Sequence, residues 1–134
     1  MSNLVLISGA GRGLGSSIAK SFVDNNYKVA INYYKSDTKA KKLSNQLGKN
    51  AHCFSADIRD FRQVESMICN IQDRFNEFPS ILVNNAMTDY VFNGDARKFA
   101  DEISWNEISD HLNVTLKGSL NLIQSLIPSM KKNS

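Results

Sequence analysis

The chain has 134 residues and a formal net charge of +3, and hydrophobic and charged residues make up 42% and 22% of it. These values are typical of one globular domain and exclude a disordered or low-complexity protein. Lys and Arg are scattered along the chain rather than gathered in a stripe, so we expect no binding to nucleic acid.

The first apolar run, at residues 4–7, is too short for a signal-peptide core or a membrane span, and no basic region precedes it. We therefore expect a cytoplasmic protein with no membrane partner. Cys53, Cys69 and the two histidines match no metal-ligand spacing and no disulfide framework. Hence no metal site is predicted, and both cysteines are expected to be small buried apolar residues.

Short apolar runs alternate with segments of helical period, a pattern that predicts an α/β fold with a parallel sheet. The predicted strands cover residues 4–8, 28–32, 51–55 and 81–84. Helices are predicted from the glycines to residue 24, at about 38–47, between the third strand and Pro79, and at about 104–130. The polar stretch 90–101 contains Asn-Gly-Asp turn chemistry and is predicted to be a surface excursion.

The last predicted helix, residues 104–130, carries apolar residues around most of its circumference. Such a helix is normally buried on two sides. One side can face the sheet, and the other needs a partner subunit or a missing segment. We therefore expect a homo-oligomer that forms through this helix, with Gly118 and Ser119 permitting close approach.

A glycine-rich loop, residues 8–15, stands between a buried strand and a helix, which is the context in which such a loop binds phosphate. Glycine lets the backbone come close to a pyrophosphate, whose charge then meets the N–H groups at the start of the helix. The alternative is a tight strand-to-helix turn that binds no ligand. The spacing of Gly9, Gly13 and Gly15 is G-x-x-x-G-x-G rather than the strict G-x-G-x-x-G.

With Ser8 before it, this spacing resembles the T-G-x-x-x-G-x-G signature of classical short-chain dehydrogenases/reductases. Asp57-Ile58 resembles the family's Asp-Val pair, residues 84–86 resemble the start of its N-N-A-G motif, and Asn113 resembles the asparagine of its catalytic tetrad. Within the family, the chain looks most like NADPH-dependent 3-oxoacyl carrier-protein reductases. The resemblance implies a Rossmann-type doubly wound parallel sheet, with residues 1–134 as a single partial NAD(P)-binding domain that stops after the fourth strand and the long helix.

The resemblance also implies the site. The expected cofactor-binding residues are Ser8, Gly9, Gly11, Arg12, Gly13, Leu14, Gly15, Tyr34, Lys35, Ser36, Asp57, Ile58, Asn84, Asn85 and Ala86. Asn113 is the expected supporting member of the catalytic tetrad. Taken singly, Asp57 also fits an ordinary residue near a helix start, and Asn84-Asn85 a solvated strand end. Met87 departs from the family, which usually has glycine there.

NADP(H) is expected as the cofactor in preference to NAD(H). NAD-specific enzymes place a carboxylate at the end of the second strand, where this chain has Asn-Tyr-Tyr at residues 32–34. Arg12, Lys35 and Ser36 can instead supply donors for a 2′-phosphate. Asp37 complicates this interpretation, because its carboxylate could reach the same position from a flexible loop.

In the family, catalysis needs a serine and a Tyr-x-x-x-Lys pair, and none of the four tyrosines here has lysine four residues later. Two hypotheses follow. The chain is the front portion of a reductase that transfers hydride to a carbonyl substrate, or it is a truncated, non-enzymatic module for dinucleotide binding or dimerisation. In either case we expect the chain alone to be inactive.

The predicted strand order 3-2-1-4 would leave the fourth strand at an exposed edge, which natural sheets avoid.

Overall fold

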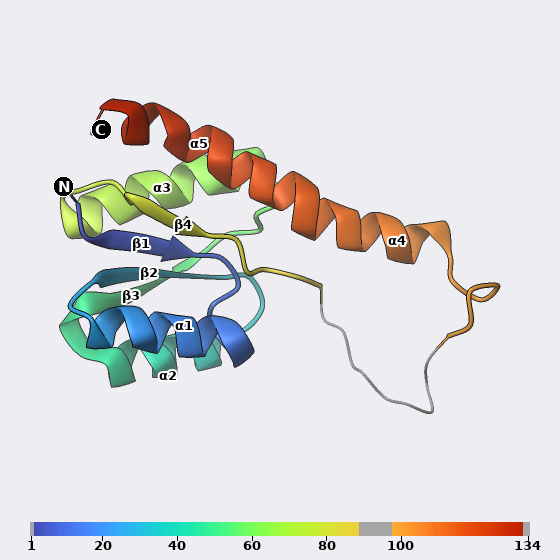
Figure 1. The fold of residues 1–134 in the computed structure, drawn as a ribbon, viewed down its shortest axis with the longest axis horizontal. Helices are drawn as coiled ribbons and strands as arrows, with labels where there is room; N and C mark the ends of the chain where they lie inside the picture. Colours follow the sequence, from blue (N-terminus) through green and yellow to red (C-terminus); the bar gives the residue numbers. More distant parts are fainter. Residues whose placement is uncertain (1, 89–97, 133–134) are drawn as a thin grey trace.

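The computed structural model of the chain describes residues 2–88 and 98–132 and places four parallel strands in one sheet. The strands are β1 (Leu4–Ile7), β2 (Lys28–Tyr33), β3 (Ala51–Ser55) and β4 (Ile81–Val83). Their order is β3-β2-β1-β4, which confirms the predicted order, and β4 lies at the edge (Figure 1). β1 is fully buried, as expected for a central strand covered on both faces.

Helices cover both faces of the sheet (Figure 1). Helices α1 (Gly13–Asp24) and α2 (Asp37–Leu47) cover one face, and a short 3-10 turn, η1 (Gly48–Asn50), leads from α2 into β3. On the other face lie α3 (Phe61–Phe75) and α5 (Ser119–Lys132), where Val64, Ile71, Leu122 and Leu126 are fully buried against β1. The architecture is therefore the expected doubly wound α/β arrangement.

The predicted helix 104–130 is continuous but not uniform. It consists of α4 (Trp105–Leu112), a π-helical segment η3 (Asn113–Gly118) and α5, which runs on to Lys132. A π-helical segment widens the helix by one residue per turn. The prediction of one regular helix was wrong in this middle part, where Gly118 packs so closely on the sheet side that an added Cβ would lie 2.6 Å from Ile58.

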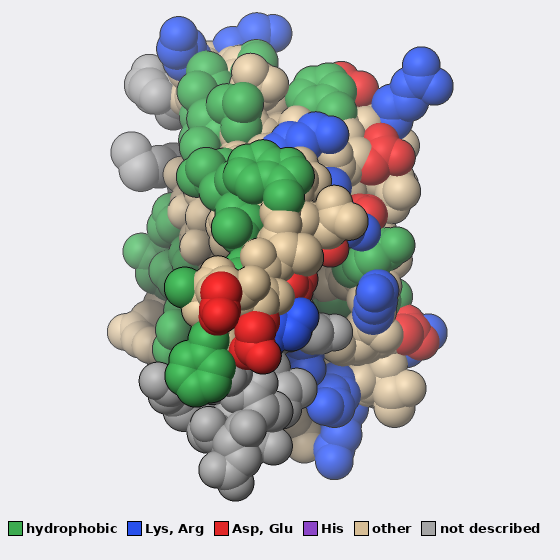
Figure 2. Space-filling model, turned by 90° about the vertical axis from the view of Figure 1, so that its right-hand side faces the viewer, with side chains coloured by type: hydrophobic (Ala, Val, Ile, Leu, Met, Phe, Trp, Pro, Cys, Tyr) green, Lys and Arg blue, Asp and Glu red, His purple; other side chains and the backbone are tan. Residues whose placement is uncertain are grey.

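Burial differs along this composite helix: α5 and Gly118 bury one side, whereas α4 has no buried residue. Figure 2 shows hydrophobic side chains gathered at the end of the molecule where α4 lies. The exposed apolar residues of the composite helix are Trp105, Ile108, Leu112, Leu116, Leu120, Ile123 and Ile127, with exposed fractions from 37% to 70%. Gly118 is buried on the opposite side, so the expectation that it lets a partner subunit approach was wrong.

Two further details differ from the expectations drawn from the sequence. Cys69 is exposed and Cys53 is only partly buried, so the cysteines are not both core residues. Leu14, whose four-residue spacing from Ile18 predicts a place on the apolar face of α1, is instead 72% exposed, because it lies in the first turn and projects beyond the core. The predicted excursion 90–101 falls mostly outside the described residues.

Among the helices that the structure describes, none is long and apolar enough to cross a membrane.

Candidate functional site

The loop between β1 and α1 is held to the segment after β4 by a buried hydroxyl group. Ser8 is almost fully buried, and its Oγ accepts hydrogen bonds from the backbone N–H groups of Asn85 and Ala86, both at 3.0 Å. In return, the Asn85 side-chain Nδ2 donates to the carbonyl oxygens of Ser8 (3.0 Å) and Gly9 (3.2 Å). These bonds join two of the predicted motifs into one rigid unit at the carboxyl edge of the sheet.

Asn32 holds the same loop from the side of β2. Its Oδ1 accepts a hydrogen bond from the N–H of Gly9 (3.2 Å), and its backbone oxygen accepts one from Ala10 (2.9 Å). Its Nδ2 donates to the carbonyl of Ala56 (3.1 Å), so one buried side chain connects β2, the loop and the end of β3. The sequence pattern predicted Asn32 only as a position without a carboxylate. A buried polar residue inside an apolar strand was the signal for this role.

Glycine is needed at the three signature positions for different physical reasons. A Cβ on Gly9 would lie 2.8 Å from Ala86 Cα, and a Cβ on Gly15 would lie 2.5 Å from Asn85 Nδ2. Both glycines are therefore required by close packing inside the protein. Gly13 has a φ of +58° and no atom within 4 Å of its Cβ position, so it faces open space above the start of α1. That is the position where a phosphate group can approach the backbone.

The start of α1 has no side-chain cap of its own. Its N-cap residue, Arg12, makes no side-chain capping bond, and the first turn contains no acidic residue. The first N–H groups of a helix lack partners within the helix, and its dipole places partial positive charge there. An open glycine and an uncapped helix start together fit a dinucleotide pyrophosphate.

The ends of β2 and β3 bring a second group of predicted residues together. A Cβ built on Gly11 would lie 3.6 Å from Ser36 Cβ, so the glycine loop adjoins the segment that follows β2. Past β3, the Asp57 carboxylate pairs with the Arg59 guanidinium, with an Nη2 to Oδ2 distance of 2.8 Å. This pairing lowers the pKa of Asp57 below its usual value. The Arg59 guanidinium also lies 5.6 Å from the centre of the Tyr34 ring.

Arg59 was missed by the sequence analysis, which stopped at Asp57-Ile58. Its only signal was an arginine two residues after a carboxylate that follows a strand. Ile58, predicted as a cofactor-binding residue, is buried, and its carbonyl accepts a hydrogen bond from Asn121 Nδ2 at 2.8 Å. Its side chain packs on Gly118, so the structure places Ile58 within the core beneath this edge.

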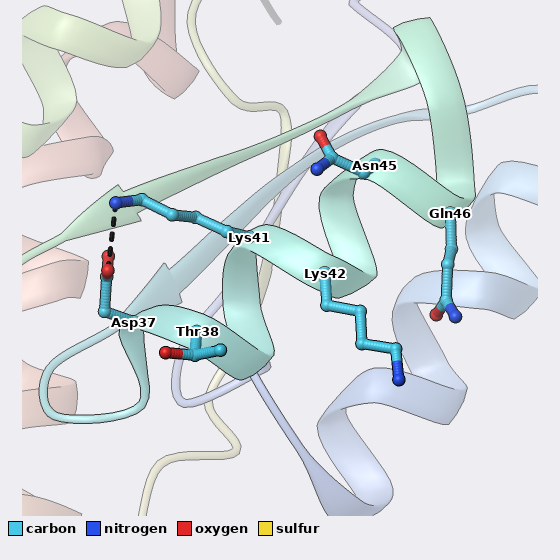
Figure 3. A pocket seen from close by; sticks show the side chains of 6 residues that line it. All are labelled: Asp37, Thr38, Lys41, Lys42, Asn45 and Gln46. Atoms are coloured by element: carbon cyan, nitrogen blue, oxygen red, sulfur yellow. Dashed lines mark hydrogen bonds and ion pairs between the residues drawn. The ribbon is translucent and has the colours of Figure 1, made fainter.

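Asp37, the alternative group for the ribose 2′ position, is bound to other side chains. Its carboxylate accepts hydrogen bonds from the Tyr33 hydroxyl (2.7 Å) and from Lys41 Nζ (2.9 Å). The Tyr33 hydrogen bond lowers the pKa of Asp37 and raises that of Tyr33 to about 12. Figure 3 shows Lys41 reaching back to Asp37 along α2. The shallow hollow drawn there is lined by Asp37, Thr38, Lys41, Lys42, Asn45 and Gln46, and contains none of the predicted cofactor residues.

The segment after β4 leads from the glycine loop toward α4. Asn84 is exposed, and Met87 is 65% exposed, so the Met87 side chain projects into solvent.

The same segment contacts α4, where Thr88 Oγ1 lies 2.5 Å from His111 Nδ1. The described hydrogen bond of Asn113 runs along its own helix, from Nδ2 to Ser109 Oγ at 3.5 Å. The helix therefore contacts this segment through His111, and the catalytic role of Asn113 stays a prediction.

Known proteins share both the sequence pattern and the fold. The short chain dehydrogenase family matches residues 3–134. The 3-oxoacyl-(acyl-carrier-protein) reductase FabG of Staphylococcus aureus is 31% identical over 133 residues, which cover 97% of this chain and 51% of that protein. The Salmonella typhimurium reductase of the same name is 39% identical over 83 residues, 62% of this chain and 33% of that protein.

Among solved structures, 3-ketoacyl-(acyl-carrier-protein) reductase from Brucella melitensis complexed with NADH superimposes with a TM-score of 0.86 at 28% identity, over 97% of this chain and 51% of that chain. Serine dehydrogenase from Escherichia coli, at 23% identity and a TM-score of 0.82, shares the fold over 97% of this chain and 57% of its own. The chain spans about half the length of the curated relatives that are similar over nearly all of it. It belongs to the short-chain dehydrogenase family, whose enzymes use a nicotinamide cofactor and act on carbonyl substrates.

Proposed function

We propose that this chain is the NADP(H)-binding portion of a reductase that transfers hydride to a carbonyl substrate of the 3-oxoacyl type. One observation carries the proposal: Ser8, Asn32 and Asn85 hold an open glycine loop against an uncapped helix start. This arrangement supports pyrophosphate binding at the edge where α/β folds hold nucleotides. The substrate class is supported by the names of the relatives from Staphylococcus aureus and Brucella melitensis.

The proposed roles follow the order of the motifs. Residues 8–15 hold the pyrophosphate through backbone N–H groups, and Asp57 and Ile58 border the adenine. Asn84, Asn85 and Ala86 border the ribose next to the nicotinamide, and Asn113 supports the proton relay. Bound NADPH would supply the hydride, and the protein would orient it and exclude water around it.

We propose NADP(H) over NAD(H) because of the charges around the end of β2. Strand β2 ends without a carboxylate, and Asp37, four residues after its last residue, is paired with Tyr33 and Lys41. Arg12 and Lys35, with the Ser36 hydroxyl, can donate charge-assisted and neutral hydrogen bonds to a 2′-phosphate. The Brucella melitensis reductase was crystallised with NADH, so the preference of this chain needs its own measurement.

The residues present do not complete the catalytic set. Tyr-x-x-x-Lys does not occur among the 134 residues, and in the family that pair donates the proton. We therefore propose that this chain alone binds the dinucleotide without reducing a carbonyl compound. The exposed apolar side of α4, η3 and α5 favours self-association, and it also supports the second candidate, a dinucleotide-binding or dimerisation module without catalysis.

The test is to titrate the purified chain with NADPH and with NADH by calorimetry. We expect tighter binding of NADPH, and Arg12→Ala should narrow the difference by about 1.5 to 3 kcal/mol, the range for hydrogen bonds to charged groups. Gly13→Asp serves as a control that should bind neither dinucleotide. Equal wild-type affinities would contradict the NADP(H) preference, and no binding of either would contradict the proposed function. Consumption of NADPH with a 3-oxoacyl thioester would contradict the proposed inactivity.

A further inference from the structure

Arg59 lies at the adenine side of the proposed site and contacts two of its predicted residues. Its Nε donates to Asp57 Oδ1 (2.9 Å) and Oδ2 (3.1 Å), and its Nη2 donates to Oδ2 (2.8 Å). Its backbone N–H also donates to Asp57 Oδ1 at 3.0 Å. This bidentate pairing fixes the plane of the guanidinium, because two parallel N–H donors of arginine match the two oxygens of a carboxylate.

The guanidinium retains donors beyond those that Asp57 uses. Nη1 takes no part in the pairing with Asp57, and a guanidinium cannot lose its proton in a protein. The Arg59 side chain is about one-third exposed, whereas that of Asp57 is 15% exposed. The carboxylate is thus turned inward and the cation outward, so the pair presents positive charge at the surface.

That surface is the one that a 2′-phosphate would face. The Arg59 guanidinium carbon lies 5.6 Å from the centre of the Tyr34 ring, and Lys35 Nζ lies 5.7 Å from the same ring. Ser36, two residues after Tyr34, adjoins the glycine loop at Gly11. Lys35 and Arg59, from the segments after β2 and after β3, therefore bring two cations to the Tyr34 ring just past the end of β2.

We infer that Arg59 is a specificity-determining residue, which cancels the charge of Asp57 and offers a further cation to the 2′-phosphate of NADP(H). The inference rests on the proposed function, because it assigns a role within the same cofactor site. It makes two separable claims about charge. Without Arg59, the 2′-phosphate loses a hydrogen-bonding cation, and the unpaired Asp57 carboxylate then repels the phosphate.

A purely structural role for Arg59 predicts a different result. Asp57 and Arg59 also shape the turn between β3 and α3, where the Asp60 N–H donates to the Asp57 carbonyl at 3.0 Å. If that turn were the whole role, removing Arg59 would weaken NADPH and NADH binding equally. The ratio of the two affinities is therefore the decisive measurement.

The experiment measures dissociation constants of NADPH and NADH for the wild-type chain, Arg59→Ala, Arg59→Lys and the double variant Asp57→Asn/Arg59→Ala. Arg62→Ala is the matched control, because Arg62 lies on the first turn of α3 and is exposed. Each variant is first checked for folding by circular dichroism. Arg59→Lys keeps a cation beside Asp57, so it remains informative if Arg59→Ala does not fold.

Arg59→Ala should lower the NADPH-to-NADH affinity ratio by about tenfold to a hundredfold, the effect of one hydrogen bond to a charged group. Arg59→Lys should lower it less, and the double variant should recover part of the loss because the repelling carboxylate is gone. Arg62→Ala should leave the ratio unchanged. An unchanged ratio in Arg59→Ala, or an equal fall in Arg62→Ala, would overturn the inference while NADPH binding still supported the proposed function. Failure of the wild-type chain to bind either dinucleotide would overturn both.

Discussion

Helices α1 and α3 both begin just after parallel strands at the same edge of the sheet, yet their first turns differ. The Asp60 side chain caps α3, accepting hydrogen bonds from the N–H groups of Arg62 (2.9 Å) and Gln63 (3.4 Å). Helix α1 begins at Arg12 with no side-chain cap and no acidic residue in its first turn. In both helices the first N–H groups lack partners within the helix, so they depend on a cap or a ligand.

The difference shows where the protein satisfies its own backbone and where it leaves donors for a ligand. An aspartate cap on a helix contributes about 0.5 to 2 kcal/mol to stability. Helix α3 has this contribution, and α1 gives it up although its N-cap backbone, with φ of −159° and ψ of 172°, is suited to a capping residue. A helix start left uncapped beside glycines is consistent with a bound anion in that place.

The largest effect on ligand binding is expected when α1 receives the side-chain cap that α3 has. Arg12→Asp should stabilise the fold by about 1 kcal/mol, because the carboxylate can accept from the first N–H groups. It should weaken NADPH binding by about a hundredfold or more, because a charge-assisted bond is lost and a like charge is added. Urea unfolding and calorimetry measure the two effects on the same protein. Weaker folding together with retained NADPH binding would show that the start of α1 is not an anion site.

A substitution at Gly15 tests how much of the loop geometry depends on close packing. Gly15→Ala should lower the free energy of unfolding by about 3 kcal/mol, near the upper end for overpacking, because the new Cβ would lie 2.5 Å from Asn85 Nδ2. The matched control is Gly13→Ala, which meets no atom within 4 Å and should cost about 1 kcal/mol for its positive φ. Equal losses in urea unfolding would contradict the packing argument.

Much of the fold was predictable from the sequence, because strand and helix patterns are local. The apolar runs at β1 and β2 and the glycine spacing placed the sheet and its loop to within a residue or two. The connecting side chains were not predictable in the same way. Asn32 acts through Ala56, 24 residues away, and Arg59 lies near the Tyr34 ring, so both depend on how β2 and β3 pair. Leu14 fits the apolar face of α1 by spacing, but the first turn of that helix projects past the core.

The π-helical segment could not be predicted from the residue pattern either. Residues 113–118 include the weak helix formers Asn, Val and Thr, but low helix propensity does not specify a π-helical turn. The widening accompanies a tertiary contact, the packing of Gly118 on Ile58. A periodicity of 3.6 residues assumes a regular helix and cannot register an inserted residue. The site was therefore predictable as a set of backbone motifs, and its side-chain electrostatics needed the structure.

Removing the cap of α3 should produce a smaller effect than changing the start of α1. Asp60→Ala should lower the free energy of unfolding by about 1 kcal/mol, because the N–H groups of Arg62 and Gln63 lose their acceptor. Dinucleotide affinity should stay unchanged, because Asp60 belongs to no predicted cofactor motif. Asp60→Asn is the control, since asparagine caps about as well as aspartate. A loss of NADPH affinity in Asp60→Ala with normal stability would mean that α3 also contributes to the ligand site.

Helix α4 adds a third kind of start, whose cap should fail in acid. Ser104 Oγ accepts from the N–H of Glu107 (3.3 Å), and the Glu107 carboxylate accepts from the N–H of Ser104 (2.9 Å). Lys98 Nζ lies 2.6 Å from Glu107 Oε1, and this pair, together with the bonds from Ser104, lowers the pKa of Glu107 from 4.5 to about 2. A carboxyl group whose folded pKa is lowered stabilises the fold above its unfolded pKa and loses that contribution as the pH falls through the folded value. The cap of α4 should therefore weaken between pH 4.5 and about 2, while the uncapped start of α1 has no acidic residue to protonate.

An NMR titration of the Glu107 carboxyl carbon measures the pKa of this group directly, and Glu107→Gln is the control that should lack the transition. The effect on overall stability should be the smallest of the series, since the side chains of Lys98 and Glu107 are both about half exposed and the pair is screened by solvent. A Glu107 midpoint near 4.5 would show that the capping box and its lysine do not hold the carboxylate, and α4 would then begin as openly as α1.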